Sequence, residues 1–390
     1  MGLDELIRRR LMNHLRVLGL VRGQNNQPVS PDQTKAALRA LHVPLRREKL
    51  RRERAFVSEQ GPRLLPFFAD GKDLNPESIS PALELIRSDT WQSRLFRLAS
   101  LTWSVPVSQG YGRRLRYLVW DQSNDRLIGL FALGDPVFNL RVRDSFIGWT
   151  AEERSERLVH MMDAYILGAV PPYSQLLAGK LIACLVRTRE VRDAFSGRYG
   201  ASKGIISGKV KAPTLSFVTT SSALGRSSVY NRLVLGGIRY FASLGYTSGW
   251  GHFHIPQDLF ELCRQYLDLS GDPYASNNRF GDGPNWRMRA LRKALSKLDL
   301  DPSLLQHGVR REVFSCELAR NARQFLAGTE PAPDYQGLLS VAEVGTLARK
   351  RWMEPRAKRH HEYQLWDKEA IIDLIVEPPA ASEGEQHVAR

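Results

Sequence analysis

Residues 165–185 read YILGAVPPYSQLLAGKLIACL, and this stretch decides the fold that the sequence predicts. The apolar run that starts at Tyr165 predicts a strand, which Pro171 and Pro172 end because proline cannot donate to a strand ladder. The longer apolar run that follows predicts a buried helix. We expect Ser174 to cap this helix, whose first backbone N–H groups would then be free to bind a phosphate or another anion. A plain cap on a core helix is the alternative.

A second stretch, residues 214–233, reads TLSFVTTSSALGRSSVYNRL. Its β-branched and aromatic start predicts a strand, its small polar residues predict a loop, and its last residues have helical spacing. Two neighbouring strand–loop–helix units would bring a pair of polar loops to one edge of a sheet. Ligands bind at that edge in open α/β sheets.

The remaining elements follow from periodicity and turn residues, and they predict an α/β (α+β) fold. A hairpin is expected from strands 115–121 and 127–134. A last strand is expected within residues 237–249. The predicted helices are 80–87, 92–100, 152–166 and several after residue 255.

Composition divides the chain into four parts. These are a helical N-terminal region at 1–72, an α/β core at 73–254, a helical and basic C-terminal region at 255–377, and a disordered tail at 378–390. The first part contains two helices separated by a turn, which suits either a plain helical hairpin or a helix-turn-helix reader of DNA.

Hydrophobic residues make up 43% of the 390 residues and charged residues 25%, which is typical of a globular protein. No apolar run is long enough to cross a bilayer, so we expect a cytoplasmic protein that does not act in a membrane. Cys184, Cys263 and Cys316 lie far apart in sequence, which favours neither a disulfide framework nor a zinc site.

The formal charge of +15 favours a polyanionic partner, and nucleic acid is the leading candidate, with DNA expected. The charge is concentrated in three blocks, at 46–54, 287–293 and 349–359, although each block alone could be a solvated helix face. A loop at 277–286 interleaves Arg279 with aromatic residues that could stack on bases. The candidate contacts are Arg279, Arg287, Arg289, Arg292, Lys293, Arg349, Lys350 and Arg351.

Three residues of the central region are candidates for chemistry or anion binding. Asp144 lies beside Arg143 and could accept a proton from an attacking amine, or it could be a buried ion-pair partner or a cap. Tyr230 could transfer a proton, or it could be a core residue on its helix. Arg226 lies in a Gly/Ser loop, where a guanidinium suits bidentate phosphate binding. His252 and His254 lack a third ligand nearby in sequence, so we expect no metal site.

The order of the predicted elements from Tyr117 to Gly249 resembles the GNAT acyltransferase fold. This resemblance implies a GNAT-like mixed sheet core with helical N- and C-terminal additions. It also implies that the turn after the fourth strand holds the pyrophosphate of an acyl-coenzyme A. Here the matching residues would be Ser174, Gln175, Gly179 and Lys180, with Tyr230 as the general acid towards the leaving thiolate. The usual Gln/Arg-x-x-Gly-x-Gly/Ala signature is absent from this chain.

A series of longer motifs resembles the DruA family of the Druantia antiphage defence systems. The motifs are LIGL at 127, GDPVF at 134, RDSFIGW at 143, PPYSQLL at 171, SALGRSSVYNR at 222, GPNWR at 283 and RWMEPRAKR at 351. The resemblance implies a bacterial defence protein that acts beside other Druantia proteins, including a large helicase-like partner.

Two functions remain open from the sequence. The chain could be a degenerate scaffold that recognises phage DNA through its basic blocks and passes it to partner proteins. It could instead be an acyltransferase-like enzyme acting on nucleic acid or a nucleotide, with an acyl-coenzyme A as cofactor. The missing coenzyme signature and the positive charge favour the first.

Overall fold

The computed structural model describes residues 2–18, 21–22, 28–29, 34–203, 210–249, 251–272 and 284–376. By contacts, the chain divides into two compact units. The first contains residues 1–51 and 248–311, and the second contains residues 52–247 and 312–380. The division of the chain into four parts by composition stays a prediction. The two units are defined by the density of contacts within them, and this does not show which parts of the chain fold independently.

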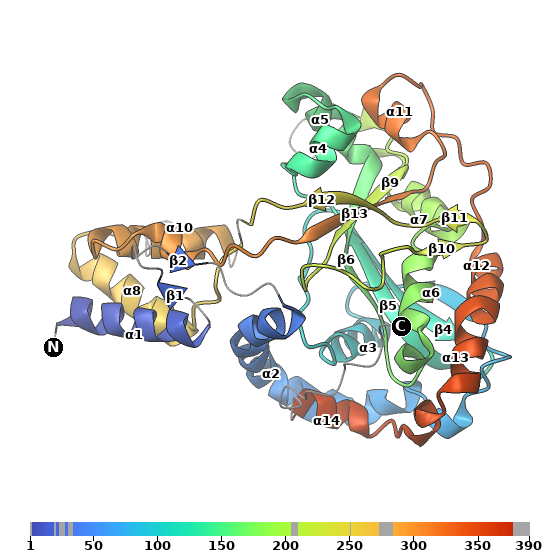
Figure 1. Cartoon of the computed structure of the whole chain (residues 1–390), viewed down its shortest axis with the longest axis horizontal. Helices are drawn as coiled ribbons and strands as arrows, with labels where there is room; N and C mark the ends of the chain where they lie inside the picture. Colours follow the sequence, from blue (N-terminus) through green and yellow to red (C-terminus); the bar gives the residue numbers. More distant parts are fainter. Residues whose placement is uncertain are drawn as a thin grey trace. The chain divides into compact units, whose positions relative to one another are not determined.

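The second unit is built on a mixed seven-stranded sheet with the order β12-β13-β9-β6-β5-β4-β3 (Figure 1). Its strands are β3 Pro81–Leu85, β4 Arg114–Asp121, β5 Arg126–Gly134, β6 Met161–Ala169, β9 Phe217–Ser221, β12 Ala242–Tyr246 and β13 Glu312–Glu317. Strands β6 and β9 run parallel, and the other neighbouring pairs in this sheet are antiparallel. The expected α/β class is therefore confirmed.

Helices cover both faces of this sheet. The larger core packs α6 (Ala178–Leu185), α7 (Arg189–Tyr199) and α12 (Val341–Ala348) against one face. A smaller core packs α4 (Arg141–Ile147) and α11 (Ala322–Ala327) against the other face. The second unit also contains the helices α3 Trp91–Ser100, α5 Ala151–Arg157, α13 Glu354–Arg359 and α14 Ala370–Val376. Two further pairs of short strands complete it. In the first pair β7 Ser202–Lys203 lies beside β8 Val210–Lys211, and in the second β10 Val234–Leu235 lies beside β11 Ile238–Arg239.

The first unit is helical apart from a two-stranded pair, β1 Val21–Arg22 with β2 Pro28–Val29. Its helices are α1 Leu3–Val17, α8 Gln257–Leu269 and α10 Pro284–Lys297, and α8 packs against both of the others. The 30-residue helix α2 (Lys35–Leu64) contributes residues to both units, since the division falls at Arg51. Thr34 precedes α2, and its hydroxyl accepts a hydrogen bond from the Ala37 N–H at 3.3 Å.

Several predicted elements are wrong. The segment expected as a helix at 80–87 contains strand β3 (Pro81–Leu85) instead, because pairing with β4 outweighs the local helical spacing. The helix expected at 152–166 ends at Arg157, and strand β6 begins at Met161. The last strand expected at 237–249 is divided between β11 and β12. Strand β13 lies within a region that was expected to be helical.

None of the helices in the described part of the chain combines the length and apolar character that a bilayer crossing requires.

Candidate nucleic-acid interface

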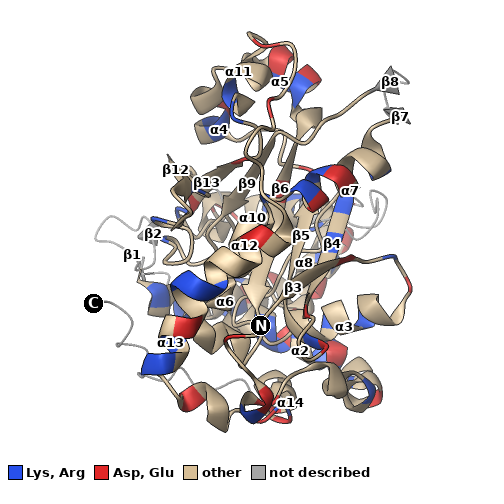
Figure 2. Ribbon diagram, turned by 90° about the vertical axis from the view of Figure 1, so that its right-hand side faces the viewer, with Lys and Arg blue, Asp and Glu red and all other residues tan. Residues whose placement is uncertain are grey.

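The third basic block forms an exposed surface on the second unit. It spans the end of α12, the π-helical turn η6 (Arg349–Met353) and α13. Figure 2 shows the blue of lysine and arginine along α13 and along the turn that joins it to α12. Within this block the exposed cations are Lys350, Arg351, Lys358 and Arg359, which we call the α13 basic surface. An anion of extended shape could contact several of them at once.

The apolar residues of the same segment hold the α13 basic surface in place. Trp352, Met353 and Ala357 are buried in the larger core of the second unit. Arg349 points inward, donating from Nη1 to the Ile79 carbonyl at 3.3 Å and pairing with Glu354 at 3.2 Å. Arg349, predicted as a nucleic-acid contact, is therefore occupied within the fold. The exposed cations project from a backbone that packing has already ordered, which lowers the entropy that binding would cost.

The predicted coenzyme turn lies beside this block. Lys180 Nζ is 5.5 Å from the ring centroid of Trp352, and Arg356 Nε donates to the Gln175 carbonyl at 3.3 Å. Burial, and after it the neighbouring Arg351 guanidinium, lowers the pKa of Lys180. The structure thus brings together Lys180 and the α13 basic surface, two sets of residues that the sequence assigned to different ligands.

The turn itself differs from the expected anion cradle. Helix α6 begins at Ala178 after Leu177, which has a positive φ of 63°, so Ser174 does not cap it. Ser174 instead lies in the 3-10 turn η4 (Tyr173–Leu176), and its side chain is exposed. The backbone N–H groups of Ser174, Gln175, Leu177 and Lys180 donate to Val170, Pro172, Ser174 and Leu177 at 2.9–3.2 Å. Donors already used in this way are unavailable to a pyrophosphate.

The second basic block lies on α10 in the first unit, and its members have different roles. Arg287 donates to Gln257 Oε1 at 2.6 Å and to the Ile255 carbonyl, and its guanidinium lies 4.4 Å from the centroid of Phe260. Lys293 pairs with Asp272 at 2.9 Å. Arg289 and Arg292 are exposed, and Arg292 also lies 3.0 Å from His252 Nε2. Arg279 lies outside the described residues.

Tyr230 lies in a turn rather than on a helix, and Arg226 lies in the loop before it. Ser227 Oγ accepts hydrogen bonds from the N–H groups of Val229 and Tyr230 at 3.1 and 3.2 Å, which replaces helical pairing locally. The expected helix at this position is therefore wrong. Arg226 is exposed. Burial raises the pKa of Tyr230 to about 12, against the effect of a hydrogen bond between its hydroxyl and Thr220.

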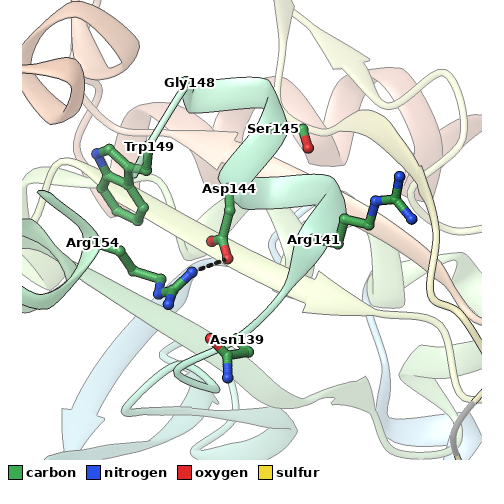
Figure 3. A pocket seen from close by; sticks show the side chains of 7 residues that line it. All are labelled: Asn139, Arg141, Asp144, Ser145, Gly148, Trp149 and Arg154. Atoms are coloured by element: carbon green, nitrogen blue, oxygen red, sulfur yellow. Dashed lines mark hydrogen bonds and ion pairs between the residues drawn. The ribbon is translucent and has the colours of Figure 1, made fainter. Parts of the chain in front are cut away.

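Asp144 lies on α4 at a pocket of about 370 Å³ (Figure 3). Its Oδ1 accepts from Arg143 Nε at 2.8 Å, and its Oδ2 accepts from Arg154 Nη1 at 3.1 Å and from the Leu140 N–H at 3.2 Å. Arg143 is fully buried, and it also donates to the carbonyls of Val137 and Phe138 at 2.8 Å. A carboxylate that accepts all these hydrogen bonds acts first as the counter-ion of a buried arginine.

Asp163 is a candidate for proton transfer that the sequence reading missed. It lies on β6 at the last register position shared with the parallel strand β9, opposite Thr219. Thr219 Oγ1 donates to Asp163 Oδ1 at 2.7 Å. Burial raises the pKa of Asp163 to about 6, although Thr219 and Arg143 act in the opposite direction. The available signal was one carboxylate within the apolar run from Met161 to Ala169.

The histidines and carboxylates of the described residues offer limited support for a metal. His254 Nε2 pairs with Glu48 at 2.7 Å. The carboxylates of Asp70, Asp367 and Glu369 come within 4.8 Å of one another. The ammonium group of Lys368 already lies 2.8 Å from Asp70 in that cluster.

Comparisons with known proteins identify relatives of the chain. Residues 32–328 match the family described as Druantia protein DruA. A curated Druantia protein DruA from Escherichia coli (strain UMEA 4076-1) is 51% identical over 369 residues, which cover 95% of this chain and 91% of that protein. No solved structure matches the chain.

Proposed function

The chain belongs to the DruA family, and on that premise we propose that it is an antiphage defence component that binds nucleic acid, with DNA as its ligand. In this proposal it acts in the bacterial cytoplasm beside other Druantia proteins, including a helicase-like partner.

The observation that carries the proposal is the α13 basic surface. Its four exposed cations belong to one ordered segment, and Lys180 lies next to the buried Trp352 of that segment. Phosphate contacts by lysine and arginine supply most of the sequence-independent affinity for nucleic acid. The net charge of +15 supports the same class of ligand. Arg226 and the exposed Arg289 and Arg292 are further proposed contacts.

The test is a titration of labelled single-stranded and duplex DNA with the full chain at several salt concentrations. Replacing Lys350, Arg351, Lys358 and Arg359 by glutamine should weaken DNA binding. It should also reduce the salt slope, which is the steepness with which the logarithm of the binding constant falls with the logarithm of the salt concentration. The reduction should be about 0.7–0.9 for each phosphate that the variant no longer neutralises. The matched control replaces four exposed cations elsewhere on the second unit, Arg54, Arg63, Lys72 and Arg94, by glutamine. If both quadruple variants lost the same amount of DNA affinity, the loss would reflect only the lower net charge, and this result would contradict the proposal.

We further propose that the second unit has a GNAT-like core. The parallel register of β6 and β9 ends at Asp163 and Thr219, although β6 continues to Ala169. A register irregularity in the pairing of β5 with β6 falls just beyond this point. A mixed sheet with this one parallel pair supports the mixed sheet core that the acyltransferase resemblance implies.

Acyl transfer to nucleic acid or a nucleotide is the second candidate function. It is favoured by one observation, the hydrogen bond between the hydroxyl of Tyr230 and Thr220 close to where β6 and β9 stop pairing. Ser174, Gln175, Gly179 and Lys180 would hold the coenzyme, with Tyr230 and Asp144 moving protons. The turn at 173–180 fits a pyrophosphate poorly, because the backbone N–H groups of Ser174, Gln175, Leu177 and Lys180 are already used within the fold. DNA binding without acyl transfer is therefore the preferred function.

Titration with acetyl-coenzyme A separates the two candidates. Micromolar binding that is lost in Lys180→Ala, together with product formation that is lost in Tyr230→Phe, would support acyl transfer. No binding at about millimolar coenzyme, a free energy weaker than about −4 kcal/mol, would leave DNA recognition as the function.

A further inference from the structure

A cleft of about 640 Å³ lies between the end of strand β3 and helix α7 in the second unit. One wall is formed by Leu85, Ile86, Arg87 and Ser88, and the other by α7 residues that include Ala194 and Arg198. Among the described residues, none that was predicted as catalytic, cofactor-binding or nucleic-acid-binding lines this cleft. It is therefore a separate feature from the α13 basic surface.

The lining combines an apolar part with positive charge. Leu85, Ile86 and Ala194 supply aliphatic surface, and none of the described residues that line the cleft is acidic. Arg87 and Arg198 are both exposed, and within the described residues neither guanidinium forms an ion pair. Two unpaired guanidinium groups next to aliphatic surface suit an anion that also carries an apolar body.

A buried hydroxyl beside the cleft supplies an independent observation. Tyr117 is 2% exposed, and its hydroxyl has no hydrogen-bond partner in the part of the chain that the structure describes. Tyr117 pairs in register with Leu85, which lines the cleft. Burial raises the pKa of Tyr117, and the nearby Arg198 acts in the opposite direction. An unmatched hydroxyl is unfavourable, and a ligand acceptor reaches it only if the lining moves, because Tyr117 is not among the residues that line the cleft.

From these observations we propose that the cleft between β3 and α7 binds a nucleoside monophosphate group, with its phosphate on Arg87 and Arg198 and its base on Leu85, Ile86 and Ala194. The group comes either from a free nucleotide or from the 5′-phosphate end of a nucleic acid strand. The volume is sufficient for a nucleotide and larger than a phosphate alone requires.

The test measures binding of 2′-deoxyadenosine 5′-monophosphate to the full chain by calorimetry, with inorganic phosphate and deoxyadenosine as half-ligands. Arg87→Gln and Arg198→Gln should each weaken nucleotide binding about tenfold or more, because each removes a charge-assisted hydrogen bond. Arg189→Gln, on the same helix but outside the cleft, is the matched control and should leave the affinity unchanged. Ala194→Leu should also weaken binding by filling the cleft, and a preserved melting temperature shows that this variant is folded.

A second arm compares the free nucleotide with a short oligonucleotide that carries either a 5′-phosphate or a 5′-hydroxyl. Preference for the 5′-phosphate that is lost in Arg198→Gln assigns the cleft to strand ends. Equal affinity for the two oligonucleotides, together with binding of the free nucleotide, assigns it to free nucleotides. The quadruple variant of the α13 basic surface should lose general DNA binding while keeping nucleotide binding, so failure of the two proposals is distinguishable. No nucleotide binding at about 10 mM, affinity that is equal in all variants, or phosphate binding as tight as nucleotide binding would each overturn the inference.

Discussion

The hydroxyl of Thr219 donates a 2.7 Å hydrogen bond to the carboxylate of Asp163 across the parallel strands β6 and β9. Burial nevertheless raises the pKa of Asp163 to about 6, above the value of about 3.9 for an unfolded chain. The folded state therefore binds more protons than the unfolded state between these two values. Its free energy of unfolding should fall as the pH rises through this window, by on the order of 1–3 kcal/mol.

Asp163→Asn removes this titration. The parent chain should lose about 1–3 kcal/mol of unfolding free energy between about pH 4 and about pH 7 that the variant does not lose. Relative to the parent chain, the variant should therefore be more stable at the higher pH than at the lower pH. Urea unfolding at both values measures it, and other carboxylates cancel in the difference. A difference that stays constant with pH would show that Asp163 titrates normally.

Asp144→Asn should destabilise the second unit by about 3–5 kcal/mol, because it leaves the fully buried Arg143 without its counter-ion. Arg154→Gln is the matched control, since Arg154 binds the same carboxylate while the pair between Arg143 and Asp144 stays intact. It should cost much less. Thermal and denaturant unfolding measure both variants, and similar losses would mean that Arg143 is not the residue that requires Asp144.

The second basic block should separate into structural and binding residues. Arg287→Met should lower the unfolding free energy of the first unit by about 1–3 kcal/mol, because it removes hydrogen bonds to Gln257 and to the Ile255 carbonyl.

Arg289→Gln combined with Arg292→Gln should leave stability within about 0.5 kcal/mol, because both side chains are exposed. If these residues contact phosphates, the double variant lowers the salt slope of DNA binding by up to about 2. An unchanged slope would remove this block from the proposed interface.

Tyr117→Phe should raise the unfolding free energy by up to about 1 kcal/mol, because the hydroxyl that it removes has no partner in the described part of the chain. The ring is retained and keeps its stacking on Phe131 at 4.6 Å. A loss of stability would show that the hydroxyl already contributes to the free fold.

Patterns that depend on neighbouring residues predicted much of the second unit. The hairpin of β4 and β5 follows from two apolar runs around a polar turn, and it forms in the expected order of strand, turn and strand. Strand β13 was missed because five of its six residues are buried. A strand covered on both faces has little alternation, so this segment was included in the region expected to be helical.

The candidate site shows the same limit. The sequence identified Lys180 and the block at 349–359 separately, but it contained no sign that Lys180 would lie over Trp352. Contacts between residues so far apart in the chain depend on tertiary packing rather than on local spacing. Asp144 was recognised as either a proton acceptor or an ion-pair partner, and its hydrogen bonds with Arg143 and Arg154 describe the second of these.

Strands β12 and β13 are antiparallel neighbours, and Tyr246 pairs with Glu312 at the point where the chain leaves the sheet and returns to it. The residues between them, which include helices α8 and α10, are therefore the connection of a single hairpin. Sheets tolerate long insertions at such positions, because the cost of closing a loop rises slowly with its length. The segment can therefore differ in length while the pairing of β12 with β13 is kept, because both ends of the connection lie side by side in the sheet.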